Sequence, residues 1–133
     1  MTLVPLIEYP AAGAEVRAVY DDIMRTRDTD RVNNFWKALA NDPPTLRRTW
    51  ESLKAVMAPG ALDPLTKELL YLAVSASNGC AYCTASHAAA AKRAGMTRDM
   101  LAELMAVVGM ANETNALANG YRVPVDESLE KLF

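Results

Sequence analysis

The stretch that decides the fold runs from Asp63 to His87 and reads DPLTKELLYLAVSASNGCAYCTASH. Asp63 and Pro64 favour the start of a helix, because an aspartate side chain accepts hydrogen bonds from free backbone N–H groups and proline suits the first helical turn. Gly79 favours its end, since glycine readily adopts the left-handed backbone that follows many helices. We therefore expect a helix over residues 64–77.

Two more helices are expected to follow, one over residues 80–95 and one capped by Thr97. The apolar side chains of the helix over residues 64–77 cover almost its whole circumference, which is typical of a helix at the centre of a protein or in a subunit interface. Val107 and Met110 widen the apolar arc of the third helix in the same way. This excess predicts self-association, and full burial of the third helix in a monomer is the alternative.

The rest of the chain extends the helical pattern outward from this stretch. Apolar side chains recur at spacings of three and four residues, and no run alternates apolar and polar residues as a strand would. Alanine is frequent and aromatic residues make up only 7%, which also favours helices over sheets. We expect an extended lead-in and four further helices, the last of them short, over residues 1–12, 15–27, 32–39, 46–57 and 126–133.

Length and charge narrow the classes of function. A chain of 133 residues has the size of one domain. Its 14 basic and 16 acidic residues are spread along the sequence and give a net charge of −2, so no nucleic-acid partner is expected. No apolar run reaches the length of about 18 residues that a membrane span needs, and the first residues lack the features of a signal peptide. We expect a cytoplasmic protein without a membrane partner.

The reactive side chains are concentrated in one short segment. The two cysteines and the one histidine of the chain are Cys80, Cys83 and His87. On a helix these side chains share one face within an arc of about 60°. Both cysteines fall in the first turn, where the helix dipole and the unpaired N–H groups favour a thiolate, and two thiols at this spacing can close a disulfide. The pattern indicates a redox-active dithiol with a proton donor beside it.

Other interpretations of these residues remain open. A zinc ion would find only three ligands in Cys80, Cys83 and His87, with an acidic side chain or water as the fourth. Buried cysteines can also act as small apolar side chains, and a thioredoxin-like enzyme would need strands that the sequence lacks. Glu68 is either a first-turn glutamate that suits the helix dipole or pairs with a basic neighbour, or a partly desolvated carboxylate that accepts a proton near neutral pH.

The same residues carry a resemblance to a known family. Residues 61–95 resemble the alkylhydroperoxidase D-like core of the carboxymuconolactone decarboxylase family, and residues 34–57 do so more loosely. The redox-active branch of that family carries Glu, eleven residues, Cys-x-x-Cys, three residues and His. The four matching residues here reproduce this spacing without a gap, namely Glu68, Cys80, Cys83 and His87.

The resemblance implies a fold and an assembly. The fold would be an all-α, antiparallel bundle of about six to seven helices. Residues 1–133 would form a single domain with its redox core over residues 61–95. The family also implies a homo-oligomer, either a trimer or a hexamer, and a peroxidase mechanism with no cofactor and no metal.

The resemblance also implies roles for single residues. Cys83 would be the peroxidatic cysteine that attacks an organic hydroperoxide or hydrogen peroxide, and Cys80 would be the resolving thiol. Glu68 and His87 would form the proton relay. A dithiol protein, either lipoyl-bearing or thioredoxin-like, would then reduce the disulfide.

Two questions remain open beside this interpretation. Tyr82 stands where some members place a second histidine, and it is either an accessory hydrogen-bond donor or a packing residue. The dithiol could serve a general disulfide reductase or a redox sensor that has no peroxide step. The family also contains decarboxylases that need no cysteine pair, in which Glu68 and His87 would act on a small acid.

Overall fold

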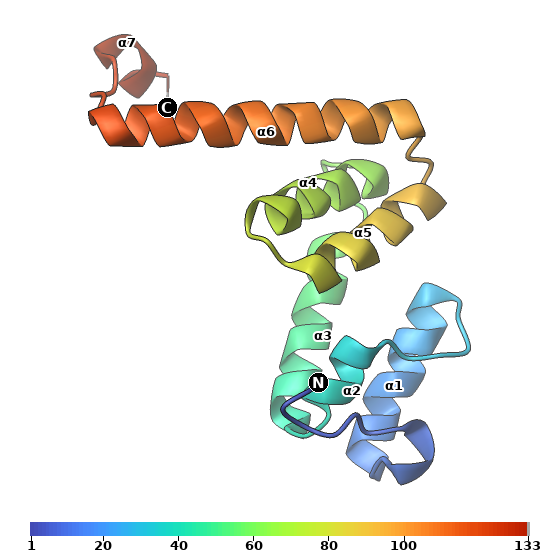
Figure 1. The fold of residues 1–133 in the computed structure, drawn as a ribbon. Helices are drawn as coiled ribbons and strands as arrows, with labels where there is room; N and C mark the ends of the chain where they lie inside the picture. Colours follow the sequence, from blue (N-terminus) through green and yellow to red (C-terminus); the bar gives the residue numbers. More distant parts are fainter. Residues whose placement is uncertain (133) are drawn as a thin grey trace. The chain divides into compact units, whose positions relative to one another are not determined.

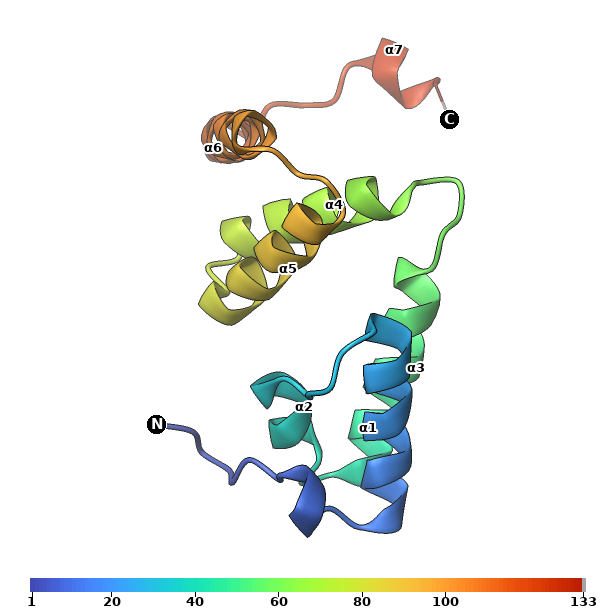
Figure 2. The same ribbon diagram turned by 90° about the vertical axis from the view of Figure 1, so that its right-hand side faces the viewer.

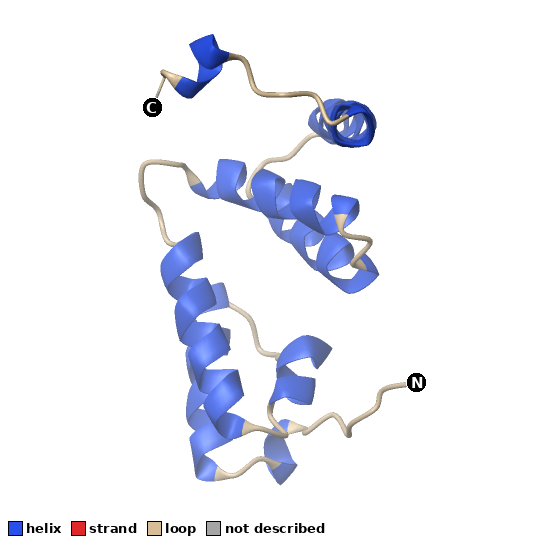
Figure 3. Ribbon diagram, turned by 90° about the vertical axis from the view of Figure 1, so that its left-hand side faces the viewer, coloured by secondary structure: helices blue, strands red, loops and turns tan. Residues whose placement is uncertain are grey.

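The computed structural model of the chain describes residues 1–132, which contain only helices and loops (Figure 3). This confirms the all-α prediction. Seven α-helices and one short 3-10 helix follow one another along the described residues (Figure 1). They are η1 (Tyr9–Ala11), α1 (Ala14–Arg27), α2 (Asn34–Leu39), α3 (Pro43–Met57), α4 (Pro64–Ser77), α5 (Ala81–Arg93), α6 (Arg98–Tyr121) and α7 (Glu127–Glu130).

Contacts divide the chain into two compact units, Met1–Ala58 and Pro59–Phe133. The first holds η1 to α3 and the second holds α4 to α7. Whether they behave as one domain, as the sequence predicts, stays a prediction. Among the described residues, no helix is both long and apolar enough to cross a membrane.

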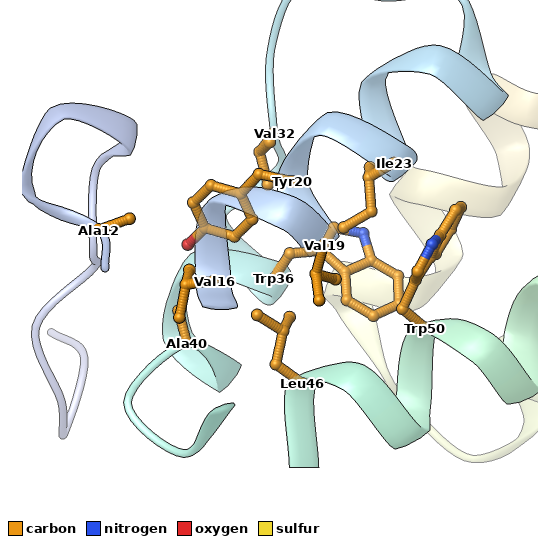
Figure 4. Close-up of a cluster of buried hydrophobic side chains, with 10 residues drawn as sticks. All are labelled: Ala12, Val16, Val19, Tyr20, Ile23, Val32, Trp36, Ala40, Leu46 and Trp50. Carbon is orange, nitrogen blue, oxygen red and sulfur yellow. The ribbon is translucent and has the colours of Figure 1, made fainter. Parts of the chain in front are cut away.

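The first unit is built around a cluster of buried apolar side chains where α1, α2 and α3 meet (Figure 4). Trp36 and Trp50 pack edge to face with ring centroids 5.4 Å apart. Such pairs stabilise a core beyond the apolar area they bury. The cluster consists of Ala12, Val16, Val19, Tyr20, Ile23, Val32, Trp36, Ala40, Leu46 and Trp50.

Hydrogen bonds of Tyr20 and Asp22 stabilise the edges of this core. The Tyr20 hydroxyl donates to the carbonyl of Ile7 at 2.8 Å and so ties the lead-in to α1, and burial raises the pKa of Tyr20 to about 12. Asp22 accepts hydrogen bonds from Lys54 Nζ at 2.5 Å and from Trp50 Nε1 at 2.7 Å. These bonds hold the pKa of Asp22 below its usual value, the one to Lys54 being the strongest cause. Asp22 therefore joins α1 to α3 as an ionised group.

In the second unit, α4 and α5 form an antiparallel hairpin, and α6 packs against α4 (Figure 2). Asp63 and Thr97 cap their helices as expected, since the side chain of Asp63 accepts from Thr66 N at 3.0 Å and that of Thr97 from Met100 N at 3.1 Å. Leu72 of α4 is fully buried. Leu72 on α4 and Ala91 on α5 are therefore the buried apolar side chains of this hairpin.

Several details differ from the sequence-based expectation. The lead-in contains the 3-10 helix η1, and α3 begins at Pro43 because proline suits a first helical turn. The last helix is the short α7, and Phe133 of the expected segment lies outside the described residues. In α6 no residue is buried, and Val107 and Met110 are exposed, so full burial of this helix in a monomer is wrong.

The bonds of Asp22 predict a pH-dependent loss of stability. In Asp22→Asn the free energy of unfolding should fall by about 1–2 kcal/mol at neutral pH, because a charge-assisted bond to Lys54 is lost. The folded-state pKa of Asp22 is depressed, so its contribution is present above the unfolded value and disappears as the pH falls through the folded value. Urea unfolding of the wild type and of Asp22→Asn at several pH values measures this difference in stability.

The control for this measurement is Asp30→Asn, because Asp30 pairs with Arg31 on the surface at 3.7 Å, and both side chains are highly exposed. It should unfold like the wild type at every pH. A stability difference for Asp22→Asn that persists unchanged into strong acid would show that the charge of Asp22 contributes nothing.

Candidate functional site

The turn between α4 and α5 places the first cysteine. Gly79 has a φ of 68°, a left-handed conformation that side-chain-bearing residues rarely adopt. Its N–H bonds to the carbonyl of Ala76 at 3.2 Å, and the N–H of Cys80 bonds to that of Ser75 at 3.0 Å. These two bonds form a Schellman motif, which closes the end of α4. Cys80 is therefore fastened to α4 before α5 begins.

Cys80 is also the N-cap of α5, and its sulfur takes part in the cap. Cys80 Sγ accepts a hydrogen bond from the backbone N–H of Cys83 at 3.3 Å. Both cysteines are free thiols and are partly buried. A sulfur in this position lies among the unpaired N–H groups of the first turn, which stabilise a negative charge.

The two thiols differ in acidity. A hydrogen bond from the Cys83 thiol, followed by that from the Cys83 backbone N–H, lowers the pKa of Cys80. The same bond between the side chains, together with burial, raises the pKa of Cys83. Of the two coupled thiols, Cys80 is therefore the more acidic and Cys83 the one that holds its proton more tightly.

Glu68 and His87 form a second pair across the hairpin. His87 Nδ1 lies 2.7 Å from Glu68 Oε2, and the two side chains are only 12% and 19% exposed. In the tautomer with hydrogen on Nδ1, this nitrogen donates to the carboxylate and the lone pair of the ring is on Nε2. Glu68 is thus paired with a histidine, whereas the alternative considered from the sequence was an arginine or lysine partner.

Helix α5 relates the two pairs to each other. Cys83 and His87 are four residues apart within Ala81–Arg93, so they lie one above the other on the same face of the helix. Tyr82 belongs to the first turn of α5 and is exposed. The hairpin thus carries all four predicted residues as two hydrogen-bonded pairs.

One contact of the site is absent from the sequence-based prediction. The ring of Tyr71 stacks on the ring of His87, with centroids 3.6 Å apart and planes 19° apart. Tyr71 follows Glu68 by three residues on α4, which places both on neighbouring positions of one face. That spacing is the signal that points to Tyr71 once Glu68 has been singled out.

The described residues contain no group of three or more His, Cys, Asp and Glu side chains that would hold a metal ion. The chemistry visible in the arrangement is that of two thiols of unequal acidity and a carboxylate–imidazole pair.

Comparison with known proteins places this arrangement in a family. A model of the carboxymuconolactone decarboxylase family matches residues 43–126. An uncharacterized protein of Cupriavidus necator is 32% identical over 85 residues, which span 63% of this chain and 74% of that protein. An uncharacterized protein of the cox locus of Paracoccus denitrificans is 36% identical over 72 residues, spanning 49% of this chain and 65% of that protein.

A solved structure gives a fuller match. The crystal structure of the alkylhydroperoxidase AhpD core from Rhodospirillum rubrum is 52% identical in sequence, covers 97% of both chains and superposes with a TM-score of 0.93. The family match spans more than half of the chain and includes the whole α4–α5 hairpin. The chain belongs to the carboxymuconolactone decarboxylase family and is alkylhydroperoxidase D-like.

Proposed function

We propose that the chain is a thiol-dependent peroxidase that reduces organic hydroperoxides or hydrogen peroxide through a dithiol/disulfide cycle. The observation that carries this proposal is the dithiol at the start of α5 with a carboxylate–imidazole pair one helical turn further along. Family membership supports an enzyme of the alkylhydroperoxidase or carboxymuconolactone decarboxylase type. The paired thiols favour the redox reaction.

In the proposed cycle Cys83 is the peroxidatic residue, although the Cys80 side chain and burial raise the pKa of its thiol. Attack therefore begins with the removal of the thiol proton. Cys80 accepts it across the bond between the thiols, or Nε2 of His87 accepts it while Nδ1 stays bonded to Glu68. This requirement gives the proton relay a definite task.

The Cys83 thiolate then attacks the terminal oxygen of the hydroperoxide, and the O–O bond breaks. The leaving alkoxide takes the proton held by the relay and departs as an alcohol, or as water from hydrogen peroxide. Cys83 is left as a sulfenic acid. Cys80 attacks its sulfur and a disulfide forms, while the departing hydroxide takes a proton from the relay, which solvent replenishes, and leaves as water.

The remaining parts of the cycle involve a partner. A dithiol protein, either lipoyl-bearing or thioredoxin-like, reduces the disulfide by thiol–disulfide exchange. We place this reaction in the cytoplasm, where such reductants keep thiols reduced, and it needs no cofactor or metal.

Tyr82, in the first turn of α5, is assigned at most an accessory role as a hydrogen-bond donor.

One observation favours a second function for the same residues. Cys80 is the more acidic thiol, and a thiolate attacks disulfides directly. A general disulfide reductase or redox sensor would use Cys80 in this way without a peroxide step. A decarboxylase-like enzyme would instead use Glu68 and His87 on a small acid and would not need the thiols.

The peroxidase cycle predicts the fate of each thiol. Mass spectrometry of the reduced protein after one equivalent of a hydroperoxide should show a loss of two hydrogens. Cys83→Ser should slow peroxide consumption roughly 10³-fold or more, because the nucleophile is gone. Cys80→Ser should stop at a sulfenic acid on Cys83, which a dimedone adduct would reveal.

Three results would separate the alternatives. Peroxide consumption that survives in Cys83→Ser excludes the assigned nucleophile. Reduction of a disulfide substrate far faster than of any peroxide indicates the reductase or sensor. Activity on a small acid that is unchanged when both cysteines are serine indicates the decarboxylase.

The coupling between the two thiols predicts opposite shifts of their pKa values in the two single-thiol proteins. In Cys83→Ala the pKa of Cys80 should rise, because its strongest stabilising donor is removed. In Cys80→Ala the pKa of Cys83 should fall, because the acceptor that retains its proton is removed. The ultraviolet absorbance of the thiolate, followed against pH, measures both. Equal pKa values in the two variants and in the wild type would refute the coupling.

We also propose that the chain forms a homo-oligomer, a trimer or a hexamer. Apolar side chains that are exposed in the single chain support this proposal, among them Leu70 and Val74 on α4 and Val107 and Met110 on α6. A monomer would leave these side chains in water, and their burial against a second copy removes that cost.

Light scattering tests the assembly. The protein should have a mass several times that of the 14.5 kDa chain, and Val107→Glu combined with Met110→Glu should lower it. The control is Asp30→Asn, which changes a surface charge in the other unit. A wild-type protein that scatters as a single chain would refute self-association.

A further inference from the structure

The contact between Tyr71 and His87 has no part in the reaction proposed above. Tyr71 is 37% exposed, so it does not belong to the fully buried core. Its face nevertheless lies against the imidazole, at 3.6 Å between centroids and 19° between planes. We infer that Tyr71 is a positioning residue, whose ring holds the imidazole of His87 in the plane in which Nδ1 bonds to Glu68. The inference rests on the proposed function for its consequence in the reaction, but not for the geometry.

The geometry of α4 explains how this would work. Glu68 and Tyr71 are one turn apart on α4, and they hold two different parts of one ring on α5. Glu68 holds the Nδ1 edge at 2.7 Å, and Tyr71 holds the flat face. A hydrogen bond at one ring atom still allows the ring to tilt and swing about that bond. Contact over the face removes this freedom, because stacked rings keep their planes together.

Fixing the plane also selects the tautomer. In the tautomer in which Nδ1–H donates to Glu68, the lone pair of the ring is on Nε2. A ring that turns away from Glu68 loses this preference and places hydrogen on either nitrogen. Because a proton acceptor must have its lone pair in a defined direction, the loss of the Tyr71 ring reduces the fraction of His87 that can accept a proton.

Two substitutions separate the ring from its hydroxyl. Tyr71→Phe keeps the ring and removes the hydroxyl, so the stacking remains. Tyr71→Leu keeps an apolar side chain that suits a helix but has no flat face. The matched control is Tyr121→Leu, which makes the same change at the highly exposed C-terminal end of α6.

Nuclear magnetic resonance of the isotope-labelled, reduced protein reads the tautomer directly, because His87 is the one histidine of the chain. The ring-nitrogen shifts of the wild type, Tyr71→Phe and Tyr121→Leu should report hydrogen on Nδ1. Those of Tyr71→Leu should report a mixture of both tautomers. Helical circular dichroism of all four proteins confirms that each is folded.

The second measurement is the rate of disulfide formation with a hydroperoxide. Tyr71→Leu should lower this rate between about 10- and 100-fold, whereas Tyr71→Phe should stay within about 2-fold of the wild type. Loss of the rate in Tyr71→Phe would overturn the inference, because the hydroxyl and not the ring would then matter. An unchanged tautomer, or an unchanged rate, in Tyr71→Leu would overturn it as well.

The two measurements also keep the inference apart from the proposed function. If the wild type forms no disulfide with peroxide, the peroxidase proposal fails. The tautomer shift in Tyr71→Leu would in that case still support the positioning role, since it depends only on Tyr71, His87 and Glu68.

Discussion

The reversal of the chain between α4 and α5 is the constraint on which the site depends. Gly79 adopts a left-handed backbone, and Cys80 then completes the Schellman motif of α4 while it begins α5 as its N-cap. One residue therefore takes part in the end of α4 and in the start of α5, so the connection between the two helices is short. Because the hairpin is this tight, α4 and α5 lie along each other, and Glu68 reaches His87 although they are 19 residues apart in sequence.

The site consists of two hydrogen-bonded pairs of side chains on the α4–α5 hairpin. In the first pair Cys80 is the more acidic thiol and Cys83 the less acidic one, and in the second a ring nitrogen of His87 is hydrogen-bonded to Glu68. Each pair contains one better acceptor and one better donor. The proposed attack by Cys83 would require the loss of its thiol proton, and α5 places the imidazole one turn away from that thiol.

Local signals explain why part of this structure was predictable. Helix caps and turns act over a few residues. The sequence alone therefore places the start of α4 at Asp63, its end near Gly79 and the start of α6 at Thr97. The fixed spacing of Glu68, Cys80, Cys83 and His87 pointed to the family, which the comparisons confirm. Their individual roles stay predictions, because spacing does not say which thiol holds a proton.

The parts that escaped prediction depend on packing. The stacking of Tyr71 on His87 needs the relative placement of two helices, which no periodicity encodes. Helix α6 runs to Tyr121, past Asn112 and Gly120, although both have low helix propensity. The apolar spacing that marks this helix in the sequence ends near Met110, so its last turns carry no such signal. The division into two compact units likewise reflects contacts, not composition.

The N-cap of α5 has a consequence for folding as well as for chemistry. The sulfur of Cys80 accepts the hydrogen bond that begins the helix, and the same bond helps to lower the pKa of this thiol. By thermodynamic linkage, whatever stabilises the thiolate in the folded protein stabilises the helix end by the same amount. A disulfide sulfur bears no charge, so in a Cys80–Cys83 disulfide this cap would be weaker than one made by a thiolate. Closing such a disulfide would therefore also lower the stability of the first turn of α5.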